Sequence, residues 1–260
     1  MKNLTHQDKT KKPSLLYRIV RGLVKLFFPK YTVFGQEKLP DGPCIIVANH
    51  SQIAGPILGE LKIPGDHFIW CSAEMMHIKE VPAYAYRDFW TEKPGWIRWF
   101  YKIFSYLIAP LSVLIFNNAH TIPVYRDARL ISTMRESTKK LSEGCKIVIF
   151  PEHKVPYNNI VYAFQDRFVD LARLYHRKTG KDLLFVPLYI APSLKQMHYG
   201  DPVLYNSEND SETERARISQ ELMQRITDLA LSLPEHTVVP YVNLPKKQYL
   251  KNIPLEVFND

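Results

Sequence analysis

Three predicted strands each end in a polar cluster, and together these clusters hold the side-chain types of a proton-transfer site. The clusters are Asn49 and His50 after residues 44–48, Arg126 after residues 121–125, and Glu152, His153 and Lys154 after residues 146–150. A histidine at a strand end can act as a general base, because such ends open into clefts in α/β folds. A base of this kind usually has a carboxylate nearby, which fixes its tautomer. We therefore expect a base, a guanidinium and a carboxylate to converge on one cleft.

The elements that would position these clusters alternate between short apolar runs and helical patterns. The predicted strands are residues 44–48, 67–71, 121–125, 146–150 and 183–190, and the predicted helices are residues 129–143 and 161–178, ended by Gly144 and Gly180. A last long helix begins near Ser211, where a capping box joins Ser211 to Glu214. Its buried stripe is predicted to comprise Ile218, Leu222, Ile226, Leu229 and Leu233. The alternation predicts an α/β fold with a mixed, largely parallel sheet flanked by helices.

An N-terminal amphipathic helical segment precedes this fold. Apolar side chains occupy one face of residues 13–31, and basic side chains, among them Arg18, Arg21 and Lys25, occupy the other. This pattern is typical of a helix that lies in a membrane interface, and it also suits a helix that covers a domain core. We expect residues 1–31 to form a basic membrane-associating segment, residues 32–235 an α/β domain, and residues 236–260 a C-terminal tail.

A second membrane candidate lies in the middle of the chain. Residues 103–116 are uncharged, but the run is shorter than the ~20 residues that span a bilayer, and Pro110 interrupts it. We therefore expect a buried or interfacial helix. The preceding stretch sets Trp90, Trp96 and Trp99 among cationic residues. That mixture is typical of the headgroup level of a membrane, and equally of a large aromatic core.

The composition is that of a folded protein of 260 residues with a formal charge of +8, which indicates an anionic partner. The three cysteines, Cys44, Cys71 and Cys145, form no CxxC pair, which argues against a disulfide framework and against a zinc site. No signal-peptide pattern is present at the N-terminus, so we expect a cytoplasmic protein.

Four short blocks in order resemble those of the glycerolipid acyltransferases, typified by 1-acylglycerol-3-phosphate acyltransferase. The blocks are N-H at residues 49–50, I-P-V-x-R at 122–126, F-P-E at 150–152 and V-P-L at 186–188, within a resemblance that covers residues 32–205. It implies an enzyme of phospholipid biosynthesis that transfers a fatty acyl group from acyl-coenzyme A or acyl carrier protein to a lysophospholipid hydroxyl. It also implies a peripheral position on the inner face of the membrane, a membrane-lipid partner, and no metal or organic cofactor.

The resemblance assigns roles to individual residues. His50 matches the general base, and Glu152 matches a third-block glutamate that is linked to acceptor binding and is grouped here with the catalytic residues. Arg126 matches the residue that holds the acceptor's phosphate, which suits a guanidinium. The remaining matches, assigned to substrate binding, are Asn49, Pro151, Lys154 and Pro187, the last on the acyl side.

The sequence also departs from the family pattern. The aspartate that follows the first-block histidine corresponds to Gly55, so the usual orienting acid is absent. The candidate substitutes are Glu74, Glu60 and Asp88, and Gln52 or a backbone carbonyl is the alternative that would orient the ring without charge. In the third block His153 replaces a glycine and Val155 replaces an arginine, although Lys154 restores a cation one residue earlier.

Other interpretations stay open beside the enzyme. A catalytically impaired lipid-binding relative would keep the fold while the first and third blocks decay. Nucleic-acid binding rests on charge alone, without a motif, and we do not expect it. A metal hydrolase built on His50, Glu152 and His153 lacks ligands at a metal-binding helix spacing. The sequence leaves no mark of an oligomeric state.

Overall fold

The computed structural model describes residues 13–91 and 93–253 of the chain. These residues form two compact units. One unit contains residues 13–28 together with 74–121, and the other contains residues 29–73 together with 122–253. The N-terminal helix is thus grouped with a segment from the middle of the chain, which the linear sequence pattern did not indicate.

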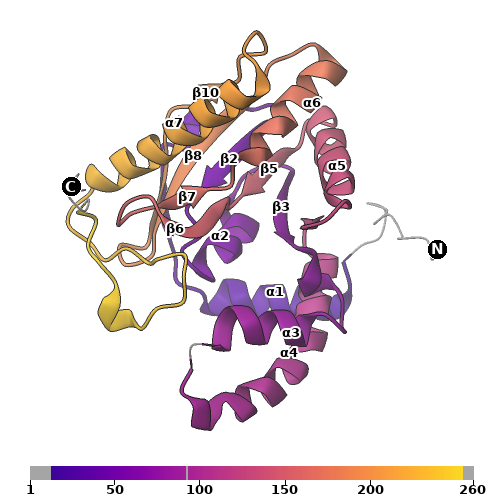
Figure 1. The fold of residues 1–260 in the computed structure, drawn as a ribbon, viewed down its shortest axis with the longest axis vertical. Helices are drawn as coiled ribbons and strands as arrows, with labels where there is room; N and C mark the ends of the chain where they lie inside the picture. Colours follow the sequence, from indigo (N-terminus) through magenta and orange to yellow (C-terminus); the bar gives the residue numbers. More distant parts are fainter. Residues whose placement is uncertain (1–12, 92, 254–260) are drawn as a thin grey trace. The chain divides into compact units, whose positions relative to one another are not determined.

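The larger unit is built on a sheet of eight described strands (Figure 1). Their order is β1 (Thr32–Phe34), β9 (Gln196–Tyr199), β8 (Leu184–Ala191), β2 (Cys44–Ala48), β5 (Lys146–Ile149), β3 (His67–Ser72) and β4 (Thr121–Val124), with β10 (Val203–Leu204) paired to β8. Strand β2 is parallel to both of its neighbours, β5 and β8, and β3 is parallel to β5. Strands β9 and β10 are antiparallel to β8. The predicted α/β fold with a mixed, largely parallel sheet is confirmed.

The central strand β2 is buried along its whole length. A strand without polar alternation is typical of a parallel sheet that is covered on both faces. Helices α5 (Leu130–Ser142), α6 (Asp170–Thr179) and α7 (Ser211–Leu231) contribute to the same core as β2, β5 and β8. A fourth helix, α2 (Ala54–Lys62), follows β2 directly and contacts β3. The carboxyl ends of β2 and β5 therefore lie side by side, where the predicted site belongs.

Two details of the predicted helices are wrong. The helix expected over residues 161–178 begins only at Asp170, because Tyr162–Phe164 forms strand β7, which pairs with β6 (Glu152–Pro156). The cap of α7 is Asp210 rather than Ser211: the Asp210 carboxylate accepts hydrogen bonds from the backbone N–H groups of residues 212 and 213. Glu214 instead accepts from the backbone N–H of Asn206. Within the predicted stripe of α7, Ile218, Leu222 and Ile226 are fully buried.

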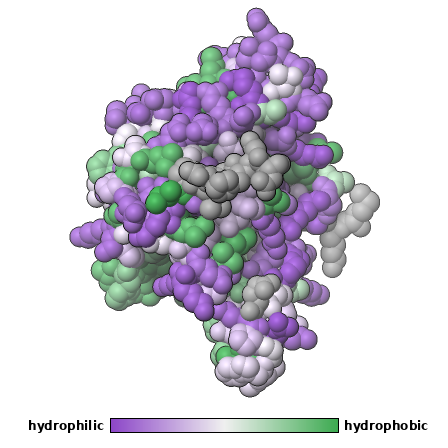
Figure 2. Space-filling model, turned by 60° about the vertical axis from the view of Figure 1, so that its left-hand side comes forward, coloured by the Kyte–Doolittle hydropathy of each residue, from purple (hydrophilic) through white to green (hydrophobic). Residues whose placement is uncertain are grey.

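The smaller unit consists of helices with much apolar surface. Its helices are α1 (Leu15–Phe27), capped by Ser14, α3 (Val81–Ala85), a π-helical turn (Tyr86–Trp90) and α4 (Arg98–Asn118). Large hydrophobic side chains are exposed on α1 and α4, with Phe27 78% and Leu107 70% exposed. Figure 2 shows several groups of hydrophobic residues, in green, among hydrophilic ones on one face of the molecule.

The middle helix overturns the buried alternative expected for this segment, whereas the interfacial alternative stays a prediction. Helical structure extends from Gly95 to Asn118, 24 residues, which is long and apolar enough to cross a membrane by length and composition. Only 17% of its most apolar window is buried. Pro110 lies inside α4 without ending it. Short 3-10 helices complete the described elements: Gln36–Lys38, Ala73–Met76, Gly95–Ile97, Asp166–Val169 and Lys246–Gln248.

Candidate active site at the end of the central strand

Asn49 fixes the carboxyl end of β2 to its neighbour β8. Its side-chain amide oxygen accepts a hydrogen bond from the backbone N–H of Ile190 at 2.7 Å, and its amide nitrogen donates to the Ile190 carbonyl at 3.0 Å and to the Ser51 hydroxyl at 2.8 Å. The side chain is buried, and these three bonds use its oxygen and both of its N–H groups. Asn49 therefore continues the sheet where the β2 backbone leaves it, and so sets the position of the next residue, His50.

The chain turns sharply after His50. Ser51 and Gln52 both have positive φ angles, 47° and 52°, a conformation that residues other than glycine adopt rarely. Two consecutive residues of this kind at the mouth of a strand store backbone strain, which is typical of functional sites. The turn leads into α2, where the Ala54 N–H donates to the Ser51 carbonyl at 3.2 Å.

Gly55, at the position where the acyltransferase pattern has an aspartate, lies against the backbone of this turn. A β-carbon at residue 55 would be 2.1 Å from the carbonyl oxygen of His50 and 3.0 Å from a ring carbon of Phe150. No side chain fits there without a shift of backbone. The missing acid is therefore part of a different local packing, in which a glycine lets α2 approach the His50 backbone.

Two aromatic rings contact the imidazole of His50. The ring centroid of Phe150 lies 5.4 Å from that of His50, at an interplanar angle of 61°. The ring centroid of Tyr241 lies 5.5 Å from that of His50, at an interplanar angle of 74°. The Nδ1 atom of His50 is buried and has no hydrogen-bond partner among the described residues. Burial lowers the pKa of His50 to about 4, and backbone groups of Gln52 and His50 oppose this shift. The imidazole is therefore neutral at pH 7 and can accept a proton, although it holds one weakly.

Glu152 is a carboxylate that is hydrogen-bonded to the backbone of this turn. One carboxylate oxygen accepts a hydrogen bond from the backbone N–H of His50, and the other accepts from the backbone N–H of Tyr162 at 2.9 Å. The side chain is buried, and burial raises its pKa to about 7 while the two N–H groups lower it. Glu152 therefore joins the turn after β2 to strand β7, and it holds the backbone of His50 rather than its ring.

The predicted cations of the site are exposed. Arg126 follows β4, which is three strands from β2 in the sheet, a lateral separation of about 14 Å at a strand spacing of about 4.8 Å. Lys154 lies in β6, two residues after Glu152, and is also exposed. The structure places both on elements that leave the same sheet, without bringing them into contact with His50 or Glu152.

The other predicted residues lie in or beside the core. Pro187 is buried inside β8, where it is in register with Val47 of the neighbouring strand β2. Val47 is three residues before His50 in the chain. Pro151 is buried, and its carbonyl accepts from the Gln165 N–H at 2.9 Å. Glu74 belongs to the smaller unit, where its carboxylate pairs with Arg87 at 3.4 Å. Their roles in binding substrate, or in replacing an acid, stay predictions.

The C-terminal segment supplies contacts that the sequence did not indicate. The Gln52 amide nitrogen donates to the Tyr249 hydroxyl at 2.9 Å and to the Val242 carbonyl at 3.3 Å. Tyr241 contacts both His50 and Tyr162, the latter at 6.0 Å. Of the two residues whose rings contact His50, Phe150 lies inside the F-P-E block that the sequence analysis identified. The segment around Tyr241 contains no motif that would have indicated this contact.

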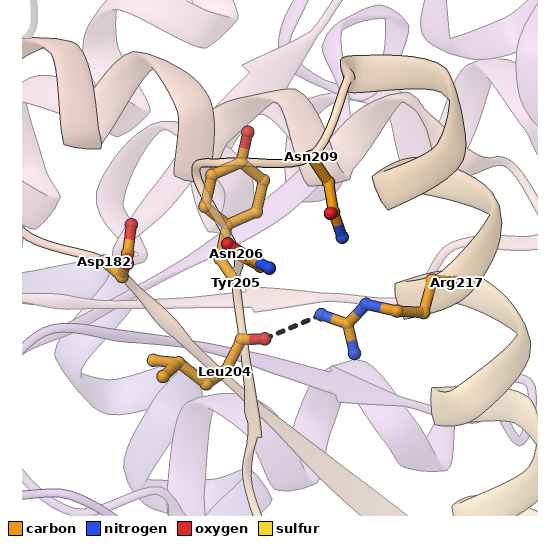
Figure 3. Close-up of a pocket in the computed structure, with 6 residues that line it drawn as sticks. All are labelled: Asp182, Leu204, Tyr205, Asn206, Asn209 and Arg217. Carbon is orange, nitrogen blue, oxygen red and sulfur yellow. Dashed lines mark hydrogen bonds between the residues drawn. The ribbon is translucent and has the colours of Figure 1, made fainter.

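A second candidate location is the surface hollow shown in Figure 3, about 440 Å³ in volume. It is lined by Asp182, Leu204, Tyr205, Asn206, Asn209 and Arg217. The guanidinium of Arg217 is bonded to Glu214, to Glu221 and to the Leu204 carbonyl at 2.8 Å. This hollow lies near the start of β8, whereas His50 lies at the opposite end of the parallel strands. Among the described residues, no group of three or more His, Cys, Asp or Glu side chains is placed to hold a metal ion.

Neither a family model nor a curated protein sequence matches the chain. Among solved structures, the chain is similar to the crystal structure of the 1-acyl-sn-glycerophosphate (LPA) acyltransferase PlsC from Thermotoga maritima. The TM-score is 0.44 at 18% sequence identity, and the match covers 82% of this chain and 80% of that chain.

Proposed function

We propose that the protein is an acyltransferase, which moves a fatty acyl group from an acyl thioester to the hydroxyl of a lysophospholipid resembling 1-acylglycerol-3-phosphate. The observation that carries the proposal is the meeting of the first and third sequence blocks, since Glu152 is bonded to the backbone of His50 across 102 residues. Residues that match the first and third family blocks thus meet at one edge of the sheet, after the neighbouring strands β2 and β5.

The proposed reaction uses His50 as the base. The substrate hydroxyl oxygen attacks the thioester carbonyl carbon while a nitrogen of His50 removes the hydroxyl proton. The C–S bond then breaks, and the leaving thiolate takes the proton back from the imidazolium. Glu152 maintains the turn that presents His50, and Arg126 is proposed to hold the acceptor's phosphate.

The low pKa of His50 sets the expected rate. General-base catalysis is most effective when the pKa of the base lies near the working pH, and a pKa of about 4 is well below it. We therefore expect slow turnover. The same observation favours a second candidate, a lipid-binding relative in which His50 no longer moves protons.

We further propose that the smaller unit binds the lipid surface on which the acceptor lies. The exposed apolar side chains of α1 and α4 support this, as do the cations Arg18, Arg21 and Lys25 on α1, because such helices are attracted to anionic membranes. A peripheral position on the inner membrane face would bring the α/β unit to a substrate that is itself part of the bilayer.

Acyl transfer by the full chain in anionic lipid vesicles tests the proposal. The assay supplies lysophosphatidate with acyl-coenzyme A or with acyl carrier protein, and it compares wild type with His50→Ala. The control is His176→Ala, which removes a histidine of α6 that is paired with Asp182. We expect activity in wild type and in the control, and its loss in His50→Ala.

Two other outcomes would change the conclusion. Activity that survives His50→Ala would show that the base is a different residue. A folded, vesicle-binding wild type without activity toward either donor would identify the lipid-binding relative.

A further inference from the structure

The C-terminal loop, residues 236–253, is anchored at both of its ends. The Val238 N–H donates to the Leu250 carbonyl at 2.9 Å, and the Asn252 N–H donates to the His236 carbonyl at 3.1 Å. The buried amide of Asn252 also donates to the Ala230 carbonyl of α7 at 2.8 Å. The loop is therefore closed on itself at its base, which limits the positions that its tip can reach.

A buried polar pair fastens the same base to the sheet. The imidazole of His236 lies 2.7 Å from the Tyr189 hydroxyl through Nε2 and 2.8 Å from the Pro234 carbonyl through Nδ1. A carbonyl can only accept, so Nδ1 donates to it, and in the neutral imidazole Nε2 then accepts from the hydroxyl of Tyr189. Tyr189 belongs to β8, the strand that also receives Asn49. The C-terminal loop and the turn after β2 thus share one support.

The tip of the loop reaches the residues around His50. Gln52, inside the strained turn, donates to Tyr249 and to the carbonyl of Val242, so it holds both arms of the tip. Between those arms and the base, Tyr241 presents its ring to the imidazole at an interplanar angle of 74°. The arrangement joins the turn that carries His50 to a segment almost two hundred residues later in the chain.

We infer that Tyr241 is a positioning residue for His50, which orients the imidazole by ring packing where a family member would use a carboxylate, and that Gln52 keeps Tyr241 in place. The inference deepens the proposed function, because it describes how the proposed base is supported. Gly55 leaves no space for an acid, and Phe150 and Tyr241 contact the ring instead.

The physical effect of this support differs from that of an acid. An edge-to-face ring pair contributes about 0.5–1.5 kcal/mol beyond the area it buries, enough to favour one ring orientation. It brings no charge, so it excludes water from the ring without stabilising an imidazolium. The low pKa of His50 agrees with that environment. The titratable groups that face the site from the packed elements are Glu152, Tyr162 and Tyr249, beside Tyr241 itself.

The test is a pH titration of His50 in the full chain, observed by NMR of isotope-labelled histidine. The His50 signal is assigned as the one that is absent from the spectrum of His50→Gln. Wild type is compared with Tyr241→Ala, Tyr241→Phe and Gln52→Asn. Asparagine tolerates the positive φ of residue 52 but is too short to keep both bonds to the loop. The control is Tyr157→Ala, which removes an exposed tyrosine from the same unit.

We expect Tyr241→Ala to raise the pKa of His50 by about one unit or more, because water reaches the ring. In Tyr241→Phe the pKa of His50 should equal the wild-type value, and in Gln52→Asn it should lie between the values of wild type and Tyr241→Ala. Tyr157→Ala should leave the pKa of His50 unchanged. A folded Tyr241→Ala protein in which His50 titrates as in wild type would overturn the inference, as would a Phe variant that behaves like Ala.

The result separates this inference from the proposed function. If the titration moves as expected while wild type transfers no acyl group, the positioning role holds and the proposed function is wrong. If acyl transfer depends on His50 while its titration is insensitive to Tyr241, the proposed function holds and the positioning role is wrong.

Discussion

An aspartate introduced by Gly55→Asp, as the acyltransferase pattern has at this position, should damage the protein rather than improve it. From sequence alone, an aspartate at residue 55 would be expected to orient His50 and raise activity. The structure predicts the opposite, because a β-carbon there lies 2.1 Å from the His50 carbonyl oxygen. Carbon contacts normally lie at about 3.5–4.0 Å, so the turn or the start of α2 must move by about 1.5 Å.

The magnitude follows from two opposing terms. Overpacking in a well-packed region costs about 1–3 kcal/mol, and the upper end applies here because the obstacle is backbone rather than a flexible side chain. A residue other than glycine in a helix gains back up to about 1 kcal/mol. We therefore expect Gly55→Ala and Gly55→Asp to lower the free energy of unfolding by about 2 kcal/mol or more, and the melting temperature by about 4–8 °C.

Urea denaturation of Gly55→Ala, Gly55→Asp and Gly59→Ala measures this effect. Gly59 is a matched control in the same helix. A β-carbon there comes closest to the movable end of Ile69, at 3.2 Å, and meets a ring carbon of Phe150 at an ordinary contact distance of 3.7 Å. Gly59→Ala should stay within about 1 kcal/mol of wild type. If Gly55→Asp unfolds at the wild-type urea concentration and transfers acyl groups faster, the packing argument is refuted.

Three further predictions follow from other contacts. Asn49→Asp should lower the free energy of unfolding by about 2–4 kcal/mol in urea denaturation, because a carboxylate would face the Ile190 carbonyl, and Ser51→Ala should cost less. The native pKa of His50 lies below its unfolded value, so the unfolded state binds the proton more readily; wild type should therefore lose stability relative to His50→Gln as the pH falls from about 6.5 toward 4. Leu107→Glu on α4 should weaken flotation with anionic vesicles, whereas Leu204→Glu, at another exposed leucine on β10, should not.

The strands and the meeting of His50 with Glu152 were predictable for a simple reason. Continuous apolar runs such as residues 44–48 are too short for a buried helix and are rich in β-branched side chains, which favours a strand, and their bounds hold to within about one residue. Once two such strands are parallel neighbours, the residues that follow them must lie at one edge of the sheet. His50 and Glu152 do so.

What could not be predicted depends on single long-range contacts. The helix expected from residue 161 is interrupted because Glu152 binds the backbone of Tyr162 and β7 pairs with β6. The local helix propensity of residues 161–169 does not depend on that bond, so it could not predict it. The C-terminal loop shows the same limit, since its position is set by a few hydrogen bonds, including those of Gln52 and Asn252, rather than by a periodic pattern.

The place of β2 in the middle of the sheet has a consequence for folding during synthesis. Its partners, β5 and β8, leave the ribosome only about one hundred residues later or more, as the Glu152–His50 and Asn49–Ile190 bonds record with separations of 102 and 141 residues. Until then an apolar strand has both edges unpaired, which is a condition that favours aggregation. Native sheet formation must wait for distant segments, so slow, non-local folding is expected. A nascent chain of this kind is a natural client for chaperones that shield hydrophobic segments, and the strand that presents His50 is the part most in need of that shielding.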